Sequence, residues 1–267
     1  MSIPIIEIVG APGAGKTTLL RAVVNGRGLS TRPIIVGKKT SLKQPRRLFR
    51  KIPELASRLS VRNRLLERFF LKSGQSFKYS PNLEASLEDW SCYVQHSLGL
   101  IHSQKSPWLF KTKVAAWWAD TFLDRLALDC IEREGVLCLD DEPLCYRLSL
   151  FNGLCDEAII RRYYELMPLP SAVAHLVIGE DELMHRVKSR ERVAARHKGL
   201  SEFELQEDVA FSANVANIAR EVLGTRGVPV LELDGSACVS RNASAVLSFS
   251  KKIAGDGSVS GDADGHC

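Results

Sequence analysis

Short apolar runs alternate with longer stretches of helical spacing along this chain. Buried parallel strands are typically short, uninterrupted and rich in Val, Ile and Leu. Five runs of this kind occur, at residues 3–9, 33–36, 136–139, 173–178 and 228–233. Apolar residues three and four apart predict helices at 16–25, about 53–103, 108–134, 155–167, from 180 onward, and 201–223. The alternation predicts an α/β fold, with a parallel sheet flanked by helices on both faces.

Three local signals refine this layout. Ser201-Glu202-Phe203-Glu204 is a capping box, which predicts a helix start at that point. Pro229 lies in the last apolar run and predicts either a strand at the sheet edge or the beginning of a strand. Residues 255–267 are rich in Gly, Ser and Asp, so we expect a disordered tail there.

The first predicted strand leads directly into a glycine-rich segment. Residues 10–18 fit the pattern G-x-x-x-x-G-K-[ST]. The glycines let the backbone curl around a phosphate chain with its N–H groups pointing inward, and the next helix adds its positive N-terminus. The sequence therefore predicts a nucleotide-binding loop formed by Gly10, Ala11, Pro12, Gly13, Ala14, Gly15, Lys16, Thr17 and Thr18.

Acidic residues follow the third predicted strand, at Asp140, Asp141 and Glu142. A parallel sheet would place them beside the phosphate loop, where Lys16 can reach the β/γ oxygens of a bound phosphate chain. We expect Asp140 and the Thr17 hydroxyl to hold Mg²⁺, and Asp141 or Glu142 to accept a proton from an attacking hydroxyl. The alternative is a solvated acidic turn.

Arginines are concentrated after the fourth predicted strand. Arg186 and Arg190 are four residues apart and therefore share a helix face. Guanidinium groups bind phosphates bidentately and stabilise charge on a transferring phosphoryl group. The alternative is a solvated basic helix.

Composition excludes several classes of protein. No stretch approaches the roughly 20 apolar residues that cross a bilayer, and the first residues lack the features of a secretory signal. The seven cysteines form no Cys-x-x-Cys pair, which argues against a disulfide framework or a structural zinc site. We expect a cytoplasmic protein.

The net charge of +5 conceals an uneven distribution. Residues 38–78 contain thirteen Lys and Arg but only two acidic residues, so this segment carries +11 and the remainder −6. Phe49, Phe69, Phe70, Phe77 and Tyr79 are interleaved with the positive charges. Such a segment suits a polyanionic partner, because basic groups neutralise phosphates and rings stack on bases. A solvated helical insertion and a membrane-surface helix are the alternatives.

Together these motifs resemble the P-loop nucleoside and nucleotide kinases, in particular the thymidylate kinase-like branch. The resemblance rests on the phosphate loop, the strand ending in acids, the Arg-x-x-x-Arg-x-Arg segment that follows Glu180-Asp181-Glu182-Leu183, and the final Leu-Asp-Gly-Ser; it covers residues 1–37 and about 135–240. It implies ATP with Mg²⁺ as cofactors, a mobile arginine-bearing lid at about 186–198, and adenine packing near Arg190 and the turn after Leu233.

The chain departs from that family over residues 38–134, and an acceptor-side Asp-Arg-Tyr or Glu-Arg-Ser signature is absent where Asp141-Glu142-Pro143 stands. We expect one kinase domain over 1–254, with a helical insertion at about 38–134. The branch includes phage enzymes that phosphorylate hydroxymethylpyrimidines in DNA, which would explain the basic segment and imply a host-cytoplasmic location. A free nucleoside, nucleotide or other small hydroxylated metabolite is the second candidate acceptor, and a regulatory P-loop NTPase or binding module is the candidate from another class.

Overall fold

The computed structural model describes residues 4–25, 34–37, 82–129, 136–141, 143–144, 148–151, 156–189, 197 and 199–256. Contacts divide the chain into two compact units. The first comprises residues 1–3, 38–134 and 149–154, and the second comprises residues 4–37, 135–148 and 155–267. The prediction of a single domain over 1–254 is neither supported nor opposed by this division and stays a prediction.

The second unit contains a five-stranded sheet in which every neighbouring pair of strands is parallel. Its strands follow the order β2-β3-β1-β4-β5, which places β1 at the centre. They are β1 (Ile5–Val9), β2 (Ile34–Gly37), β3 (Val136–Asp140), β4 (Ala172–Val177) and β5 (Val230–Asp234). All five predicted strands are thus present.

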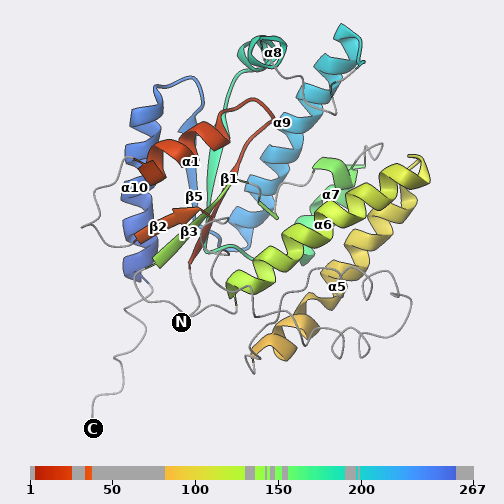
Figure 1. Cartoon of the computed structure of the whole chain (residues 1–267), viewed down its shortest axis with the longest axis horizontal. Coiled ribbons are helices and arrows are strands. Elements are labelled where there is room, and N and C mark those ends of the chain that lie inside the picture. Colours follow the sequence, from red (N-terminus) through yellow and green to blue (C-terminus); the bar gives the residue numbers. More distant parts are fainter. Residues whose placement is uncertain are drawn as a thin grey trace. The chain divides into compact units, whose positions relative to one another are not determined.

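Helices cover both faces of this sheet (Figure 1). On one face lie α1 (Lys16–Asn25) and α10 (Val239–Asp256), which also contact each other. On the other face α9 (Glu202–Thr225) contacts β4, and both α7 (Glu157–Leu166) and α8 (Glu180–Lys188) pack on α9. The predicted α/β fold, a parallel sheet flanked by helices on both faces, is therefore confirmed.

The two faces of the sheet differ in chemistry, because alternate residues of a strand point to opposite faces. The face under α1 and α10 is apolar. Its buried sheet residues are Ile6, Ile8, Leu137, Leu139, Ala172, Ala174, Leu176 and Leu233, which pack against Leu19, Val23, Ala243 and Val246. The opposite face carries buried polar side chains: Glu7 and Asp140 are register partners on adjacent strands, and His175 lies on β4.

The first unit contains a helix pair, α5 (Asn82–Ser103) and α6 (Trp108–Asp129). Trp118 stacks on Phe122 with ring centroids 5.3 Å apart, and its indole Nε1 donates to the Tyr93 hydroxyl over 3.2 Å. Trp118 is therefore a core residue, whereas Trp108 and Trp117 are 68% and 51% exposed. A short 3-10 helix, η1 (Leu148–Phe151), completes the described elements.

Two of the local signals behave as predicted, whereas the first two residues of the expected disordered tail, Gly255 and Asp256, belong to α10 and the rest of that tail lies outside the described residues. The capping box is present, since Ser201 Oγ accepts from Glu204 N over 3.3 Å while Glu204 Oε2 accepts from Ser201 N over 2.8 Å. Pro229 precedes β5, and β5 is an edge strand, so both predicted consequences of this proline hold. The helix predicted to reach residue 134 is described only to Asp129, and the predicted helix before residue 82 lies outside the described residues.

One helix has no counterpart in the sequence prediction. α10 spans 18 residues and buries Ala243, Val246 and Ser250 at helical spacing. Ala245, Leu247, Phe249 and Ile253 pack against the same core, and serines and lysines separate these apolar residues in the sequence. None of the helices in the described part of the chain is long and apolar enough to cross a bilayer.

Candidate functional site

The segment from Gly10 to Gly15 connects the central strand β1 to the N-terminus of α1. Gly10, Gly13 and Gly15 have φ values of 154°, 115° and 100°, in a region that side-chain-bearing residues seldom adopt. A Cβ atom on Gly10 would lie 2.9 Å from the Leu176 carbonyl oxygen, so the loop approaches β4 too closely for any other residue. The loop turns back on itself through a 3.0 Å hydrogen bond from Ala14 N to Ala11 O.

Lys16 lies at the first position of α1, and its ammonium group folds over this loop. Nζ donates to the carbonyl oxygens of Gly10 over 2.6 Å and Ala11 over 3.2 Å. Thr17 and Thr18 follow on the exposed first turn. A positive side chain, a helix N-terminus and a glycine-rich backbone thus converge on one small volume. This combination is suited to an anion such as phosphate.

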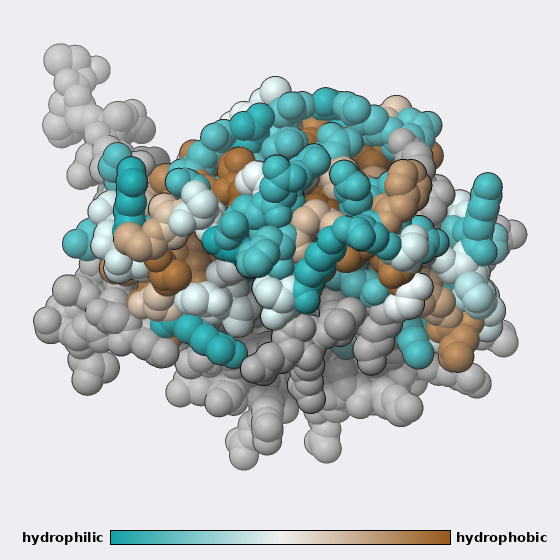
Figure 2. Space-filling view, turned by 90° about the horizontal axis from the view of Figure 1, so that it is seen from above, coloured by the Kyte–Doolittle hydropathy of each residue, from teal (hydrophilic) through white to brown (hydrophobic). Residues whose placement is uncertain are grey.

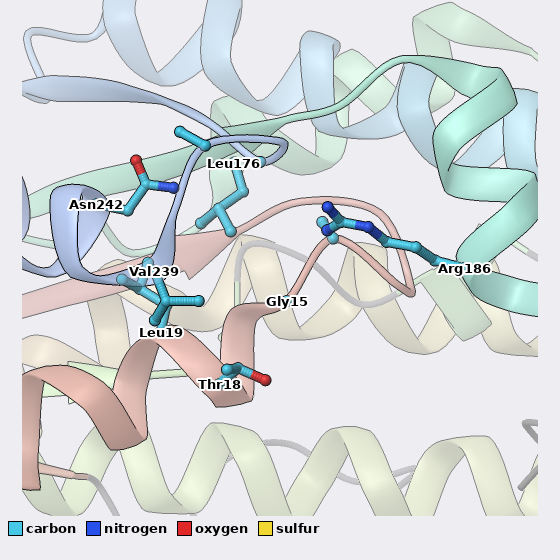
Figure 3. Close-up of a pocket in the computed structure, with 10 residues that line it drawn as sticks. Gly15, Thr18, Leu19, Leu176, Arg186, Val239 and Asn242 are labelled. Carbon is cyan, nitrogen blue, oxygen red and sulfur yellow. The ribbon is translucent and has the colours of Figure 1, made fainter. Parts of the chain in front are cut away.

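A cavity of about 240 Å³ adjoins the loop (Figure 3). Three regions far apart in the sequence form it: the phosphate loop with α1, the β4–α8 region, and the turn from β5 into α10. Its lining residues are Ala14, Gly15, Thr18, Leu19, Leu176, Arg186, Gly235, Ala237, Val239 and Asn242. Leu19, Leu176 and Val239 give it apolar walls, and Arg186 and Asn242 add polar groups.

Arg186 is the predicted arginine that the structure brings to this cavity. Its side chain extends from α8 toward the loop at Gly15 (Figure 3). The guanidinium Nε donates to Glu182 Oε1, one helical turn earlier, over 2.7 Å, and the side chain remains 31% exposed. The positively charged guanidinium group of Arg186 therefore lines the cavity, and the Glu182 carboxylate holds it in place through its Nε atom.

The turn after β5, which the sequence resemblance associates with adenine, lines the same cavity. Sequence reasoning did not identify Val239 or Asn242, because both belong to α10, the helix it missed. Hydrogen bonds from Ser236 lower the pKa of the Asp234 carboxyl at the end of β5. A hydrogen bond with Ser240 lowers the pKa of the exposed Cys238 thiol at the start of α10.

The acidic residues lie at the end of β3, the strand next to β1. Asp140 is 4% exposed and pairs in register with Glu7, three residues before the loop begins. Asp141 is partly exposed. Glu142 and Arg190 lie outside the described residues, as do the basic segment 38–78 and most of the predicted lid beyond Ser189.

No protein-family model matches this chain, and no curated protein matches it. Three solved structures to which it is similar are kinases. They are a deoxyadenosine kinase from M. mycoides with bound dATP, a shikimate kinase from Bacteroides thetaiotaomicron, and a thymidylate kinase from Candida albicans.

These similarities are spread over whole chains at low sequence identity. The deoxyadenosine kinase has 13% identity and a TM-score of 0.46, with 92% of this chain and 99% of that chain covered. The shikimate kinase has 12% identity and a TM-score of 0.37, with 93% and 98% covered. The thymidylate kinase has 12% identity and a TM-score of 0.44, with 95% and 94% covered.

Proposed function

We propose that this protein is an ATP-dependent kinase that transfers the γ-phosphate of ATP to a hydroxyl group. The observation that carries the proposal is the phosphate loop with its adjoining cavity. The loop has three glycines at positive φ, the Lys16 ammonium group bonded to its carbonyl oxygens, and a helix N-terminus directly after it. The cavity beside it has apolar walls that suit a nucleobase.

The residues present fit ATP. Lys16 Nζ is held by two loop carbonyls, and a triphosphate offers it stronger, charged acceptors in the same place. In the proposal, Gly10 to Thr18 bind the phosphates and the turn after Leu233 packs against the base. Arg186, with Arg190 outside the described residues, neutralises charge that develops on the transferred group.

The residues also fit Mg²⁺, which would supply charge neutralisation at the β- and γ-phosphates. An exposed hydroxyl at Thr17 and a carboxylate at Asp140 are oxygen donors of the kind that this ion prefers. We assign the general base, which takes the proton of the acceptor hydroxyl, to Asp141 or Glu142.

For the acceptor we propose a hydroxymethylpyrimidine within DNA. The support is the +11 charge of residues 38–78 with its interleaved aromatic residues, because polymer phosphates require several neutralising groups whereas a free nucleotide requires few. A free nucleoside, nucleotide or other small hydroxylated metabolite is the alternative acceptor. In a third reading, the protein is a regulatory NTPase without any acceptor.

An acceptor screen tests these readings. The protein is incubated with Mg²⁺ and γ-labelled ATP, together with duplex DNA containing 5-hydroxymethylpyrimidines, unmodified DNA, or free nucleosides and nucleotides. The proposal expects label in the modified DNA alone. Label only in the monomers would overturn the DNA acceptor but leave the kinase, and phosphate release without labelled acceptor would support the regulatory NTPase.

Lys16→Ala is the variant that ties the activity to this loop. Removing its ammonium group should lower transfer by at least about a hundredfold, since charge stabilisation at the transferred phosphate is lost. Lys251→Ala removes an exposed lysine of α10 and is the matched control, which should retain activity. Equal activity in both variants would contradict the proposed site.

A further inference from the structure

The turn between β5 and α10 forms one wall of the cavity, through Gly235, Ala237 and Val239. The following inference rests on the proposed function and concerns how this wall is held in place. A nucleobase that packs against a turn gains more binding energy when the turn is already ordered, because no conformational entropy is lost on binding. The bonds that order the turn therefore influence binding of the base.

Asp234 is the centre of the hydrogen bonds that hold the turn. Its side-chain Oδ1 accepts from Ser236 N over 2.9 Å and from Ser236 Oγ over 2.5 Å. Its carbonyl oxygen accepts from Ala237 N over 3.1 Å and from the side-chain Nδ2 of Asn242 over 2.7 Å. One residue thus fixes the turn through both its side chain and its backbone.

Gly235 fixes the turn on its other side. Its N–H donates to the Val177 carbonyl oxygen over 2.6 Å, and a Cβ atom on it would lie 2.9 Å from that oxygen. The turn is therefore attached to the end of β4 as well as to the end of β5. Its attachment to α10 is made by the side chain of Asn242.

Asn242 supplies that last attachment from the first turn of α10. Its side chain is 7% exposed and lines the cavity, and its Nδ2 reaches back eight residues to the Asp234 carbonyl. In Figure 3 the amide lies beside the turn, between Leu176 and the start of α10. It is the described side chain that joins α10 to the end of β5 by a hydrogen bond.

We propose that Asn242 and Asp234 are positioning residues for the nucleobase of the donor. They hold the turn in the conformation that the base packs against and leave the phosphate loop unaffected. Their contribution is thus to recognition of the base, separable from binding of the triphosphate by Lys16 and the loop. This separation distinguishes a positioning role from a general contribution to folding.

Two probes resolve the proposal: MgATP, which has a base, and magnesium tripolyphosphate, which has none. Dissociation constants are measured by calorimetry for the wild-type protein and for Asn242→Asp, which keeps the shape of the side chain but places an oxygen against the Asp234 carbonyl. We expect MgATP to bind about tenfold more weakly and tripolyphosphate to change less than twofold. In turnover, KM for ATP should rise while kcat stays within about twofold.

A second pair of variants tests the proposal independently, in case Asn242→Asp does not fold. Asp234→Ala removes the exposed carboxylate that accepts hydrogen bonds from Ser236. This variant should also bind MgATP more weakly while its affinity for tripolyphosphate stays unchanged. Asp234→Asn keeps an oxygen acceptor and should restore most of the affinity. Ser250→Ala, which deletes the buried hydrogen bond to Val246 O farther along α10, is the matched control and should leave both constants unchanged.

The outcomes separate this inference from the proposed function. If wild-type protein binds neither probe, the proposed function is overturned and the base-positioning role with it. If wild-type protein binds both probes but Asn242→Asp weakens both equally, or neither, only the positioning role is overturned. Selective loss of MgATP affinity supports it.

Discussion

At the scale of single residues, His175 is an ionisable group buried within the sheet. It lies on β4, is 2% exposed, and pairs in register with Glu232 on β5. Burial lowers its pKa to about 4, and the positive charge of Arg220 adds to this effect while Glu232 opposes it. Arg220 itself donates to Glu232 over 2.7 Å. His175 is therefore buried in its neutral form.

The folded protein should lose stability as the pH falls through the range in which only the unfolded chain protonates His175. The stabilising contribution is complete above about pH 6.5, the ordinary histidine pKa, and is lost progressively as the pH falls toward 4. Between pH 7.5 and 5.0 the expected loss is about 2 kcal/mol. Urea unfolding of wild-type protein and of His175→Leu at the two pH values measures it.

His175→Leu should show a correspondingly smaller loss between those pH values. The exposed histidine of α8 gives the matched variant, His185→Leu, which should behave like the wild type. An equal pH dependence in wild-type protein and His175→Leu would contradict the assignment of this acid sensitivity to His175.

At the scale of elements, the capping box of α9 should contribute measurably to stability. Ser201→Ala removes the acceptor of Glu204 N and the partner of the Glu204 carboxylate, leaving the first turn of a 24-residue helix without its side-chain cap. Such losses cost about 1 kcal/mol. Denaturant unfolding at pH 7 gives the value, and Ser244→Ala, an exposed serine on α10, should change it by less than about 0.5 kcal/mol.

Elements with a strong local signal could be predicted from the sequence. The β-branched run at Ile5–Val9, the glycine loop and the Ser201–Glu204 cap each specify their structure within a few residues, and each was identified. α10 was not, because serines and lysines separate its apolar residues and its buried face includes the polar residues Asn242 and Ser250. A helix of that kind is defined mainly by what it packs against, which is the apolar face of the sheet.

The residues of the candidate site likewise divide into those that a local sequence motif predicts and those that only the folded arrangement brings together. The phosphate loop is a contiguous motif and was predictable residue by residue. Asn242 and Val239 were not, since they acquire their place only when α10 lies beside α1 and the end of β5 reaches the cavity. The hydrogen bond from Asn242 to Asp234 joins residues eight apart with a turn between them, and no sequence pattern encodes it.

At the scale of the whole molecule, charge is divided between a strongly basic segment and a mildly acidic remainder. Hydrophilic side chains form much of the described surface on the face shown in Figure 2, with hydrophobic ones scattered among them. The basic segment 38–78 lies outside the described residues, so its role is tested through binding. If it contacts DNA phosphates, affinity for DNA must depend steeply on salt.

We expect the logarithm of the DNA association constant to fall linearly with the logarithm of salt concentration, with a slope of about −0.9 per phosphate contacted. Replacing Arg46, Arg47, Arg50 and Lys51 by Gln should make that slope shallower. MgATP binding should change little with these replacements. Fluorescence anisotropy with labelled duplex DNA measures the slope, and Lys251→Gln with Lys252→Gln on α10 is the control pair. An unaltered slope in the four-residue variant would contradict DNA contact by this segment.

α1 and α10 pack against each other but are far apart in the sequence, so the ribosome synthesises them at different times. The phosphate loop begins at residue 10, and it emerges from the ribosome more than 200 residues before the opposite wall of its cavity, which begins at Gly235. The glycine-rich loop can therefore form early, whereas the apolar face of the sheet is covered only in part, by α1, until α10 has been synthesised. α10 covers the remaining part of this apolar face and supplies one wall of the cavity, so a chain that lacked α10 would be aggregation-prone and would have an incomplete cavity.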